Sequence, residues 1–323
     1  MTQIDADAGF DVLTMGRSGV DLYPLQIDVG LEDVTSFGKF LGGSPTNVAV
    51  AAARHGRSAA VVTGVGDDPF GIYVRRQMRE LGVDDRFVIT DPNLHTPITF
   101  CEIHPPDDFP LWFYREPSAP DLQLTPEHLR AHAEAVTSAT LFWVTVTGLS
   151  VEPSRSAHRE ALEIRGKRTH TVLDLDYRPT LWESEAAARE AVGEILGQVS
   201  VAVGNREECA MAIGETEPER AAAALLDAGV EVAIVKMGPR GVLAATADEQ
   251  VVVEASTVEV LNGLGAGDGF GGALCHGLLS GWDLHRMVSF ASAAGAIVAS
   301  RLECSTAMPT TAEVESLMSG VAV

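Results

Sequence analysis

The feature that most constrains the fold is an alternation, along most of the chain, of short apolar runs with stretches of helical period. The apolar runs are expected to be strands at Val12–Met15, Ala59–Thr63, Leu141–Val146, Thr171–Leu175, Val201–Val203 and Val232–Val235. Helical period is found at Asn47–His55, Gly71–Leu81, Ser154–Arg165, Glu185–Leu196 and Pro218–Asp227, and later at Ala266–Ser280 and Asp283–Ser300. This order predicts an α/β fold with a mostly parallel central sheet flanked by helices on both faces.

Two segments, at about 22–41 and 96–115, break this alternation. Both carry aromatic and β-branched residues in alternation and show no helical period. They could be hairpins at the edge of the sheet. Because both lie beside the motifs described below, we favour a small β lid over a pocket at the carboxyl ends of the parallel strands, where ligand sites of α/β proteins lie.

The formal net charge of −22 limits the partners of the chain. Binding to nucleic acid or to an anionic membrane is not expected, and an anionic ligand would need local cations inside its pocket. Four widely spaced cysteines and nine histidines without ligand spacing predict buried thiols in a reducing compartment and no structural zinc site. The N-terminus does not resemble a signal peptide and no apolar run is long enough to cross a bilayer, so a cytoplasmic protein is expected.

A glycine-rich stretch near the C-terminus, Asn262-Gly-Leu-Gly-Ala-Gly-Asp-Gly-Phe270, opens an apolar helix. Each glycine inside a helix costs about 1 kcal/mol relative to alanine, so four of them need a reason. One reading is a tight turn before a core helix. The other is an anion cradle, in which backbone N–H groups at the helix start face a phosphate and Asp268 lies beside it.

Four further turns follow expected strands. Gly16-Arg-Ser-Gly-Val-Asp21 is a weak signal on its own, and Gly42-Gly-Ser-Pro-Thr-Asn47 is read either as a ligand-binding turn or as a helix cap by Asn47. Asn205-Arg-Glu-Glu208 suits Mg²⁺ held through water but equally a solvated helix start. Lys236-Met-Gly-Pro-Arg-Gly241 is another glycine-rich turn at a strand end.

Taken in this order and spacing, the five turns resemble those of the ribokinase (PfkB) family of carbohydrate kinases over essentially the whole chain. The resemblance rests on Gly42-Gly43 with Asn47, Asn205 with Glu208, Gly238 with Gly241, and Gly265-Ala-Gly-Asp268. It implies one ribokinase-like kinase domain over residues 1–323, with ATP and Mg²⁺ as cofactors and the two segments as its lid.

The resemblance also implies a role for each motif residue. Asp268 would be the catalytic base, and Gly265, Ala266 and Gly267 would form the anion hole. The sugar hydroxyls would bind Asp21, Gly42, Gly43 and Asn47. The nucleotide would lie against Asn205, Lys236, Gly238, Gly241 and Gly265, and Glu208 would organise magnesium through water. Phosphoryl transfer needs positioning and charge neutralisation, which backbone amides at a helix start supply.

One departure from the family pattern concerns the monovalent cation. The family motif usually begins with an aspartate followed by a threonine, and here those positions are Asn262 and Gly263. The carboxylate that normally helps to hold this cation is missing. We therefore expect weak or no dependence on potassium.

Two arginines suggest the substrate class. Arg115 ends the second lid segment and Arg178 follows a strand, both in an acidic chain. A random arginine is more often solvated or in an ion pair. A guanidinium group nevertheless matches the two oxygens of a carboxylate, and the pair resembles the carboxylate clamp of family members that act on keto-deoxy sugar acids.

Within that group, Tyr114–Asp121, Leu173–Pro179 and Thr306–Pro309 look most like the branch that serves myo-inositol catabolism, which phosphorylates the 6-hydroxyl of 5-dehydro-2-deoxy-D-gluconate. A 2-keto-3-deoxygluconate kinase, a neutral-sugar fructokinase or ribokinase, and a non-catalytic sugar-binding module on the same fold are the alternatives. A dinucleotide-dependent dehydrogenase is disfavoured because the glycine-rich stretch lies late in the chain, outside an early βαβ unit. Family members with such a lid often pair through it, so a homodimer is expected.

Overall fold

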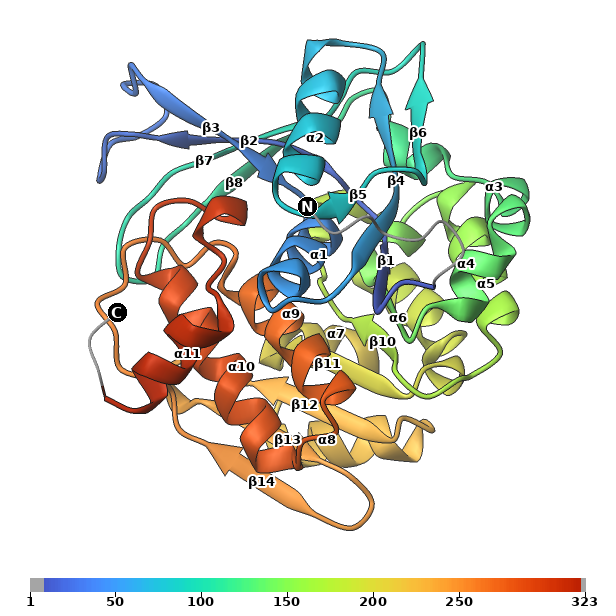
Figure 1. The fold of residues 1–323 in the computed structure, drawn as a ribbon, viewed down its shortest axis with the longest axis vertical. Helices are drawn as coiled ribbons and strands as arrows, with labels where there is room; N and C mark the ends of the chain where they lie inside the picture. The colour runs from blue at the N-terminus through green and yellow to red at the C-terminus, as the bar shows by residue number, and fades with distance from the viewer. Residues whose placement is uncertain (1–8, 321–323) are drawn as a thin grey trace.

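A ten-stranded sheet lies at the centre of residues 9–320, the part of the chain that the computed structural model describes (Figure 1). Parallel neighbours follow the order β12-β11-β10-β9-β1-β4-β5, β6 pairs with β4, and β13 and β14 extend the sheet antiparallel beyond β12. The strands are β1 (Val12–Met15), β4 (Ala59–Gly66), β5 (Val83–Asp84), β6 (Val88–Asp91), β9 (Leu141–Thr145), β10 (Thr171–Asp174), β11 (Val201–Asn205), β12 (Val232–Lys236), β13 (Val242–Ala245) and β14 (Gln250–Val253).

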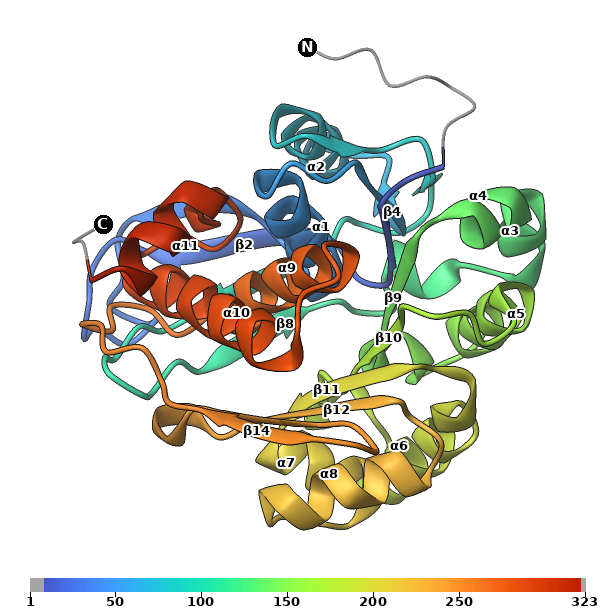
Figure 2. The ribbon, with the colours of Figure 1, turned by 60° about the horizontal axis from the view of Figure 1, so that its bottom comes forward.

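Helices cover both faces of this sheet, as Figure 2 shows for the strands β11, β12 and β14 between α10 and α6–α8. Successive residues of a strand place their side chains on opposite faces of the sheet. Val12 and Trp143 pack into the core on one face, whereas Leu13 and Phe142 pack into the core on the other. The first core is closed by α1 (Ser44–Arg54), α2 (Pro69–Glu80), α9 (Ala266–Leu279), α10 (Leu284–Ala299) and α11 (Thr311–Met318). The second is closed by α3 (Pro126–Ala131), α4 (Ala133–Ser138), α5 (Ser154–Arg165), α6 (Glu185–Gly193), α7 (Arg206–Ile213) and α8 (Pro218–Asp227).

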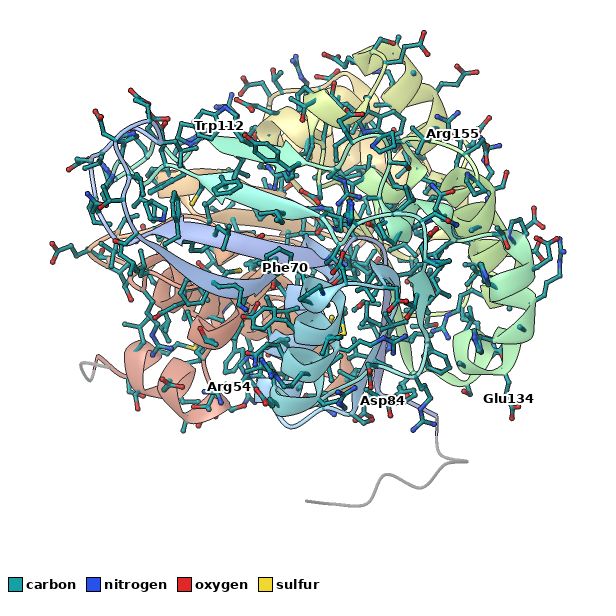
Figure 3. The ribbon with its side chains drawn as sticks, turned by 90° about the horizontal axis from the view of Figure 1, so that it is seen from above. Arg54, Phe70, Asp84, Trp112, Glu134 and Arg155 are labelled. Carbon is teal, nitrogen blue, oxygen red and sulfur yellow. The ribbon has the colours of Figure 1, made fainter. Side chains whose placement is uncertain are left out.

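A separate four-stranded sheet, which we name the lid after its predicted role, has the order β3-β2-β7-β8. It is built from β2 (Gly19–Pro24), β3 (Phe37–Gly42), β7 (Ile98–Cys101) and β8 (Leu111–Tyr114). Figure 3 shows these strands side by side, with Trp112 on the edge strand β8. The two segments that interrupt the alternation in the sequence thus pair with each other, although about 60 residues separate them.

The predicted α/β class with a mostly parallel sheet is confirmed. The sequence did not indicate the antiparallel strands β13 and β14 or the short helices α3 and α4. A short antiparallel hairpin and helices of six residues carry too few periods to be distinguished from loops. Helix α7 begins at the Asn205–Glu208 turn, so the helix-start reading of that motif is correct.

Candidate active site

The predicted motifs meet along one edge of the sheet. The first motif follows β1, the segment from Asp174 to Arg178 follows β10, Asn205 ends β11 and Lys236 ends β12. Since these strands are parallel members of one sheet, their carboxyl ends share an edge. The start of α9 brings the glycine-rich turn to the same edge, so that five segments from distant parts of the chain gather there.

The turn into α9 presents unpaired backbone donors. Gly265 is the N-cap of this 14-residue helix, with φ +82°, and no side chain caps the helix. A Cβ atom on Gly265 would lie 2.2 Å from the Sγ atom of Cys304. The amides of Gly267 and Asp268 lie in the first turn, where a helix offers no acceptor, and the helix dipole adds positive potential there. The turn can therefore hold an anion.

Asp268 is half-buried beside this turn and has a fixed hydrogen-bond partner. The Nδ2 atom of Asn47 donates to Oδ2 of Asp268 at 2.8 Å, and Ser305 donates to Oδ1 of Asn47 at 2.8 Å, so the amide of Asn47 has one orientation. Burial raises the pKa of Asp268, and the hydrogen bond from Asn47 partly offsets that rise. Asn47 lies inside the first turn of α1, whose N-cap is Gly43, so its alternative reading as a helix cap is wrong.

Asp21 joins the site from lid strand β2. Burial raises the pKa of Asp21 to about 6, although Arg17 and a hydrogen bond from Tyr23 oppose the rise. A Cβ atom on Gly42 would lie 2.1 Å from Oδ1 of Asp21, and one on Gly43 would lie 2.4 Å from the carbonyl oxygen of Arg17. A side chain at position 42 would therefore collide with Asp21 within the lid. One at position 43 would collide with the loop that follows β1.

A small cavity of about 50 Å³ lies between the lid and the start of α9. It is enclosed by residues of the lid, of both glycine-rich turns and of the loop after β10: Arg17, Asp21, Tyr23, Gly43, Ser44, Asn47, Thr99, Leu111, Phe113, Arg178, Leu264, Gly265, Asp268 and Cys304. We call this space the sugar cavity. Of the predicted sugar-binding residues, it brings together Asp21, Gly43, Asn47 and Arg178.

The two predicted arginines differ in their surroundings. Arg178 lies at the sugar cavity with Nη2 2.8 Å from Oδ1 of Asp176. Arg115 donates from Nη2 to Oδ2 of Asp121 at 2.7 Å, and the two side chains are 10% and 2% exposed. Arg115 is absent from the described residues that line the sugar cavity. The geometry therefore gives Arg115 the ion-pair role, the alternative reading of this residue.

A second cavity, of about 1120 Å³, opens between the start of α7 and the turn after β12. Asn205, Glu208, Lys236 and Gly238 line it, and so does Arg178, which borders both cavities. We call it the nucleotide cavity. Asn205 and Glu208 form a reciprocal cap: Oδ1 of Asn205 accepts from the amide of Glu208 at 2.9 Å, and Oε2 of Glu208 accepts from the amide of Asn205 at 2.6 Å.

Lys236 connects the two cavities. A Cβ atom on Gly267 would lie 3.3 Å from Nζ of Lys236, so the ammonium group lies against the anion-binding turn. Burial alone would lower the pKa of Lys236, but nearby carboxylates, with Glu208 and Asp174 foremost, raise it. Lys236 therefore stays charged. Gly241 has φ +85°, and a Cβ atom there would lie 1.9 Å from the carbonyl oxygen of Val253 at the end of β14. Any other residue at position 241 would therefore collide with that strand.

Comparison with known proteins decides the family. The model of the pfkB family carbohydrate kinases matches residues 11–311 of the chain. The chain belongs to the pfkB family of carbohydrate kinases. Proteins named 5-dehydro-2-deoxygluconokinase from Photobacterium profundum and Shouchella clausii are 37% and 33% identical to it. The alignments cover 96% of this chain in both cases, and 96% and 95% of those relatives.

Solved structures place the pfkB chain among ribokinase-like proteins. A ribokinase II from E. coli in complex with ATP and Mg²⁺ superposes with a TM-score of 0.86 at 26% identity, over 96% of this chain and 99% of that one. A PfkB protein from Polaromonas sp. JS666 gives 0.81 at 26% identity, over 95% and 99% of the chains. The chain is thus a carbohydrate kinase with a ribokinase-like fold, of a kind that uses ATP and Mg²⁺.

The residues of this kinase fit magnesium bound together with a nucleotide. Within residues 9–320, no group of three or more potential ligands gathers into a protein-only metal site. Mg²⁺ commonly keeps several waters and uses one or two carboxylates together with phosphate oxygens. Glu208 uses Oε2 for the helix cap and has Oε1 left for such a role. In the same part of the chain, no helix is long and apolar enough to span a membrane.

Several site residues escaped sequence reasoning. Arg17, Ser44 and Cys304 line the sugar cavity, and Asp174 and Asp176 are buried behind it. Ser44 donates to Oδ2 of Asp174 at 3.3 Å. Arg17 and the two aspartates stand inside stretches already singled out as strand-end motifs, so their position was a usable signal. Cys304 carried none, because it reaches the site only through the packing of the loop after α10.

Proposed function

We propose that this kinase transfers the γ-phosphoryl group of ATP to the 6-hydroxyl of a keto-deoxy sugar acid, 5-dehydro-2-deoxy-D-gluconate. The names of the relatives that align over nearly the full chain support this substrate. The observation that carries the proposal is a half-buried carboxylate, that of Asp268, at a helix start without a side-chain cap, in a cavity that guanidinium groups also line. A neutral sugar would need no such cations, and 2-keto-3-deoxygluconate is the nearest alternative acid.

Asp268 is proposed as the general base. Its raised pKa brings it closer to the working pH, which suits a group that must take a proton from an alcohol. Asn47 holds the carboxylate in one orientation, and the amides at 265–268 with Nζ of Lys236 supply positive potential where charge spreads during transfer. When bound, MgATP supplies the phosphoryl group, and Asn205, Lys236, Gly238 and Glu208 line the cavity proposed for it.

The sugar cavity is far smaller than the roughly 300–1,000 Å³ of ordinary small-molecule sites. We infer that the lid moves outward to admit a six-carbon acid and then closes over it. Closure would exclude water from the transferred group, which disfavours hydrolysis of ATP.

We also propose that potassium is dispensable. Nδ2 of the buried Asn262 donates to the carbonyl oxygen of Leu302 at 2.7 Å, and Oδ1 accepts from the amide of Leu264 at 3.1 Å. The amide group thus satisfies a backbone carbonyl that would otherwise favour a cation.

A homodimer through the lid is proposed from its outer face. Trp112 and Tyr114 on β8 are 40% and 64% exposed, and Leu25 after β2 is 53% exposed. Phe100 packs edge-on against both Phe37 and Tyr114, with ring centroids 5.5 and 5.3 Å apart, so the patch extends across the sheet. Light scattering on the wild type and on Trp112→Lys tests this, with a dimer expected only for the wild type.

The experiment that tests the function is an ADP-release screen with ATP and Mg²⁺ against neutral sugars and keto-deoxy sugar acids. We expect turnover to be highest with 5-dehydro-2-deoxy-D-gluconate and the product to carry phosphate on the 6-hydroxyl. Preference for a neutral ketose would overturn the substrate. Tight binding of the acid in a calorimeter without ADP release would favour the binding-module alternative.

A further inference from the structure

We propose that Arg17, held together with Arg178 by the shared carboxylate of Asp176, is the residue that recognises the carboxylate of the sugar acid, whereas Arg115 is a structural ion pair. This assignment rests on the proposed function and names a specificity-determining residue for it. It replaces one half of the clamp expected from the sequence.

The backbone at Gly16 directs Arg17 into the site. Gly16 has φ +143°, and a Cβ atom there would lie 2.8 Å from Oγ1 of Thr145 and 3.0 Å from Cγ of Pro45. Only glycine allows the chain to turn this tightly from β1 past the end of β9. Arg17 follows at once, and its guanidinium carbon lies 5.7 Å from the ring centroid of Phe113 on the inner face of the lid.

Asp176 fixes both guanidinium groups from behind. Nη2 of Arg17 donates to Oδ2 of Asp176 at 2.9 Å, and Nη2 of Arg178 lies 2.8 Å from Oδ1. The Asp176 side chain is 5% exposed and that of Arg17 12%. Although burial alone would raise it, the pKa of Asp176 is held well below its ordinary value by Arg17 and Arg178. Asp176 therefore remains ionised and keeps both arginines in place.

This arrangement leaves hydrogen-bond donors for a ligand. One carboxylate holds two guanidinium groups, and the second positive charge is offset in part by Asp21 and Asp268, which attract Arg17 from the lining of the sugar cavity. Nε of Arg17 and Nε of Arg178 are buried without a hydrogen-bond partner among residues 9–320. Buried donors of this kind usually have partners, so their lack points to a ligand that supplies acceptor oxygens. A carboxylate matches the planar fork of a guanidinium group.

Arg115 lies outside the described lining of the sugar cavity. Its charge is matched one to one by Asp121, which is 2% exposed and also lies outside that lining. Although Nε of Arg115 is also buried without a partner within residues 9–320, it does not face that cavity. The pair ties the end of β8 to the segment Pro120–Gln123 and so supports the lid.

The test compares Arg17→Met and Arg17→Lys with Arg115→Met. The dissociation constant and KM are measured for 5-dehydro-2-deoxy-D-gluconate, and the dissociation constant for the neutral alcohol in which a hydroxymethyl group replaces its carboxylate. For both Arg17 variants we expect the acid to bind about 10- to 100-fold more weakly and the alcohol to bind within about threefold of wild type, as for the loss of a charge-assisted hydrogen bond. Arg115→Met should affect the two ligands equally.

Each outcome is decisive. Equal losses for acid and alcohol in the Arg17 variants, or selective loss of the acid in Arg115→Met, would overturn the assignment. Arg17→Lys retains the charge beside Asp176, so it decides the question if thermal melting shows that Arg17→Met does not fold. If the wild-type enzyme does not turn over sugar acids at all, the proposed function fails. If it does but the Arg17 variants show no selectivity, only the present inference fails.

Discussion

Arg178 borders both the sugar cavity and the nucleotide cavity, which differ in size and in lining. The sugar cavity is small, with a volume of about 50 Å³, and two of its carboxyl groups, those of Asp21 and Asp268, accept hydrogen bonds from other lining residues. The nucleotide cavity is much larger, with a volume of about 1120 Å³, and its lining includes a helix start and a strand end.

This difference indicates which of the two cavities selects the substrate. At the sugar cavity, burial raises the pKa of the carboxyl groups of Asp21 and Asp268. Electrostatic interactions are strong where water is excluded, so chemistry and substrate choice belong to this side. At the nucleotide cavity, Asn205 and Glu208 cap each other at the start of α7, and Lys236 keeps its charge.

The largest effect is expected from Asp268→Asn, because it removes the base and keeps the shape. We expect kcat to fall by about 10²- to 10⁴-fold, the usual contribution of a general base, with the dissociation constant of the sugar nearly unchanged. Stopped assays of ADP release and calorimetry measure the two quantities. The control is Asp283→Asn at the exposed start of α10, where Asn can replace Asp as the cap, and where full activity is expected. Normal turnover in Asp268→Asn would show that Asp268 is not the base and that the chemistry does not depend on this carboxylate of the sugar cavity.

A smaller effect is expected at the nucleotide cavity from Glu208→Gln. Glutamine can still accept the hydrogen bond from the amide of Asn205, so the change tests the charge rather than the cap. We expect the Mg²⁺ concentration for half-maximal rate to rise by about tenfold, as for the loss of a ligand-orienting group. Titration of the rate with Mg²⁺ measures it.

The matched control for this variant is Glu313→Gln. Glu313 has the same capping-box position in α11, with its side chain accepting from the amide of Thr310 at 2.7 Å. Because its charge also pairs with Arg301, the variant should melt at a lower temperature but keep its Mg²⁺ dependence. An identical Mg²⁺ curve for wild type and Glu208→Gln would remove Glu208 from its proposed role.

A pH profile sharpens the contrast further. Because the pKa of Asp21 is raised to about 6, we expect KM for the sugar to rise several-fold as the pH falls below 6 and the carboxylate is protonated. As the pH falls, kcat should begin to decrease at a higher pH than it would with an ordinary carboxyl as the base, because the pKa of Asp268 is raised. Asp21→Asn should abolish the rise of KM at low pH and leave the decrease of kcat at low pH unchanged. A KM that stays flat to pH 5 would contradict this.

The same shift predicts an effect on stability. A carboxyl whose pKa is higher in the folded than in the unfolded chain costs stability above its folded pKa, and the cost disappears as the pH falls from about 6 toward 4. Asp21→Asn should therefore stabilise the protein at pH 7 by up to about 3 kcal/mol, from two pKa units at about 1.4 kcal/mol each. The gain should vanish near pH 4 in urea denaturation.

The smallest effect is expected from potassium. Addition of K⁺ to a K⁺-free assay should change the rate by less than about twofold, because the amide of Asn262 already satisfies the carbonyl of Leu302. Asn262→Asp places a carboxylate against that carbonyl and should introduce K⁺ stimulation. A large increase in the rate of the wild-type enzyme would show that the cation site does not need this carboxylate.

Much of the site could be predicted from the sequence. The glycine-rich turn with Asp268, and Asn47 near the start of α1, were identified from motifs, and Asn205 and Glu208 were placed at a helix start. These motifs are local, because a turn that needs glycine or an uncapped helix start is determined by a few consecutive residues. Two glycines that were predicted to contact a ligand also have a packing role: Gly42 leaves room for the side chain of Asp21, and Gly241 leaves room for the carbonyl oxygen of Val253.

The alternating elements and the strand-end turns could be predicted from the sequence, because periodicity and turn chemistry act over short distances along the chain, and the ordered set of turns resembles that of the kinase family. Only the tertiary structure decided which arginine faces the sugar cavity. Arg115 and Arg17 each follow a strand, but one finds Asp121 close in sequence and the other finds Asp176, 159 residues away. Whether a charge is matched or left available depends on neighbours in space, and those are set by the packing of the lid and sheet.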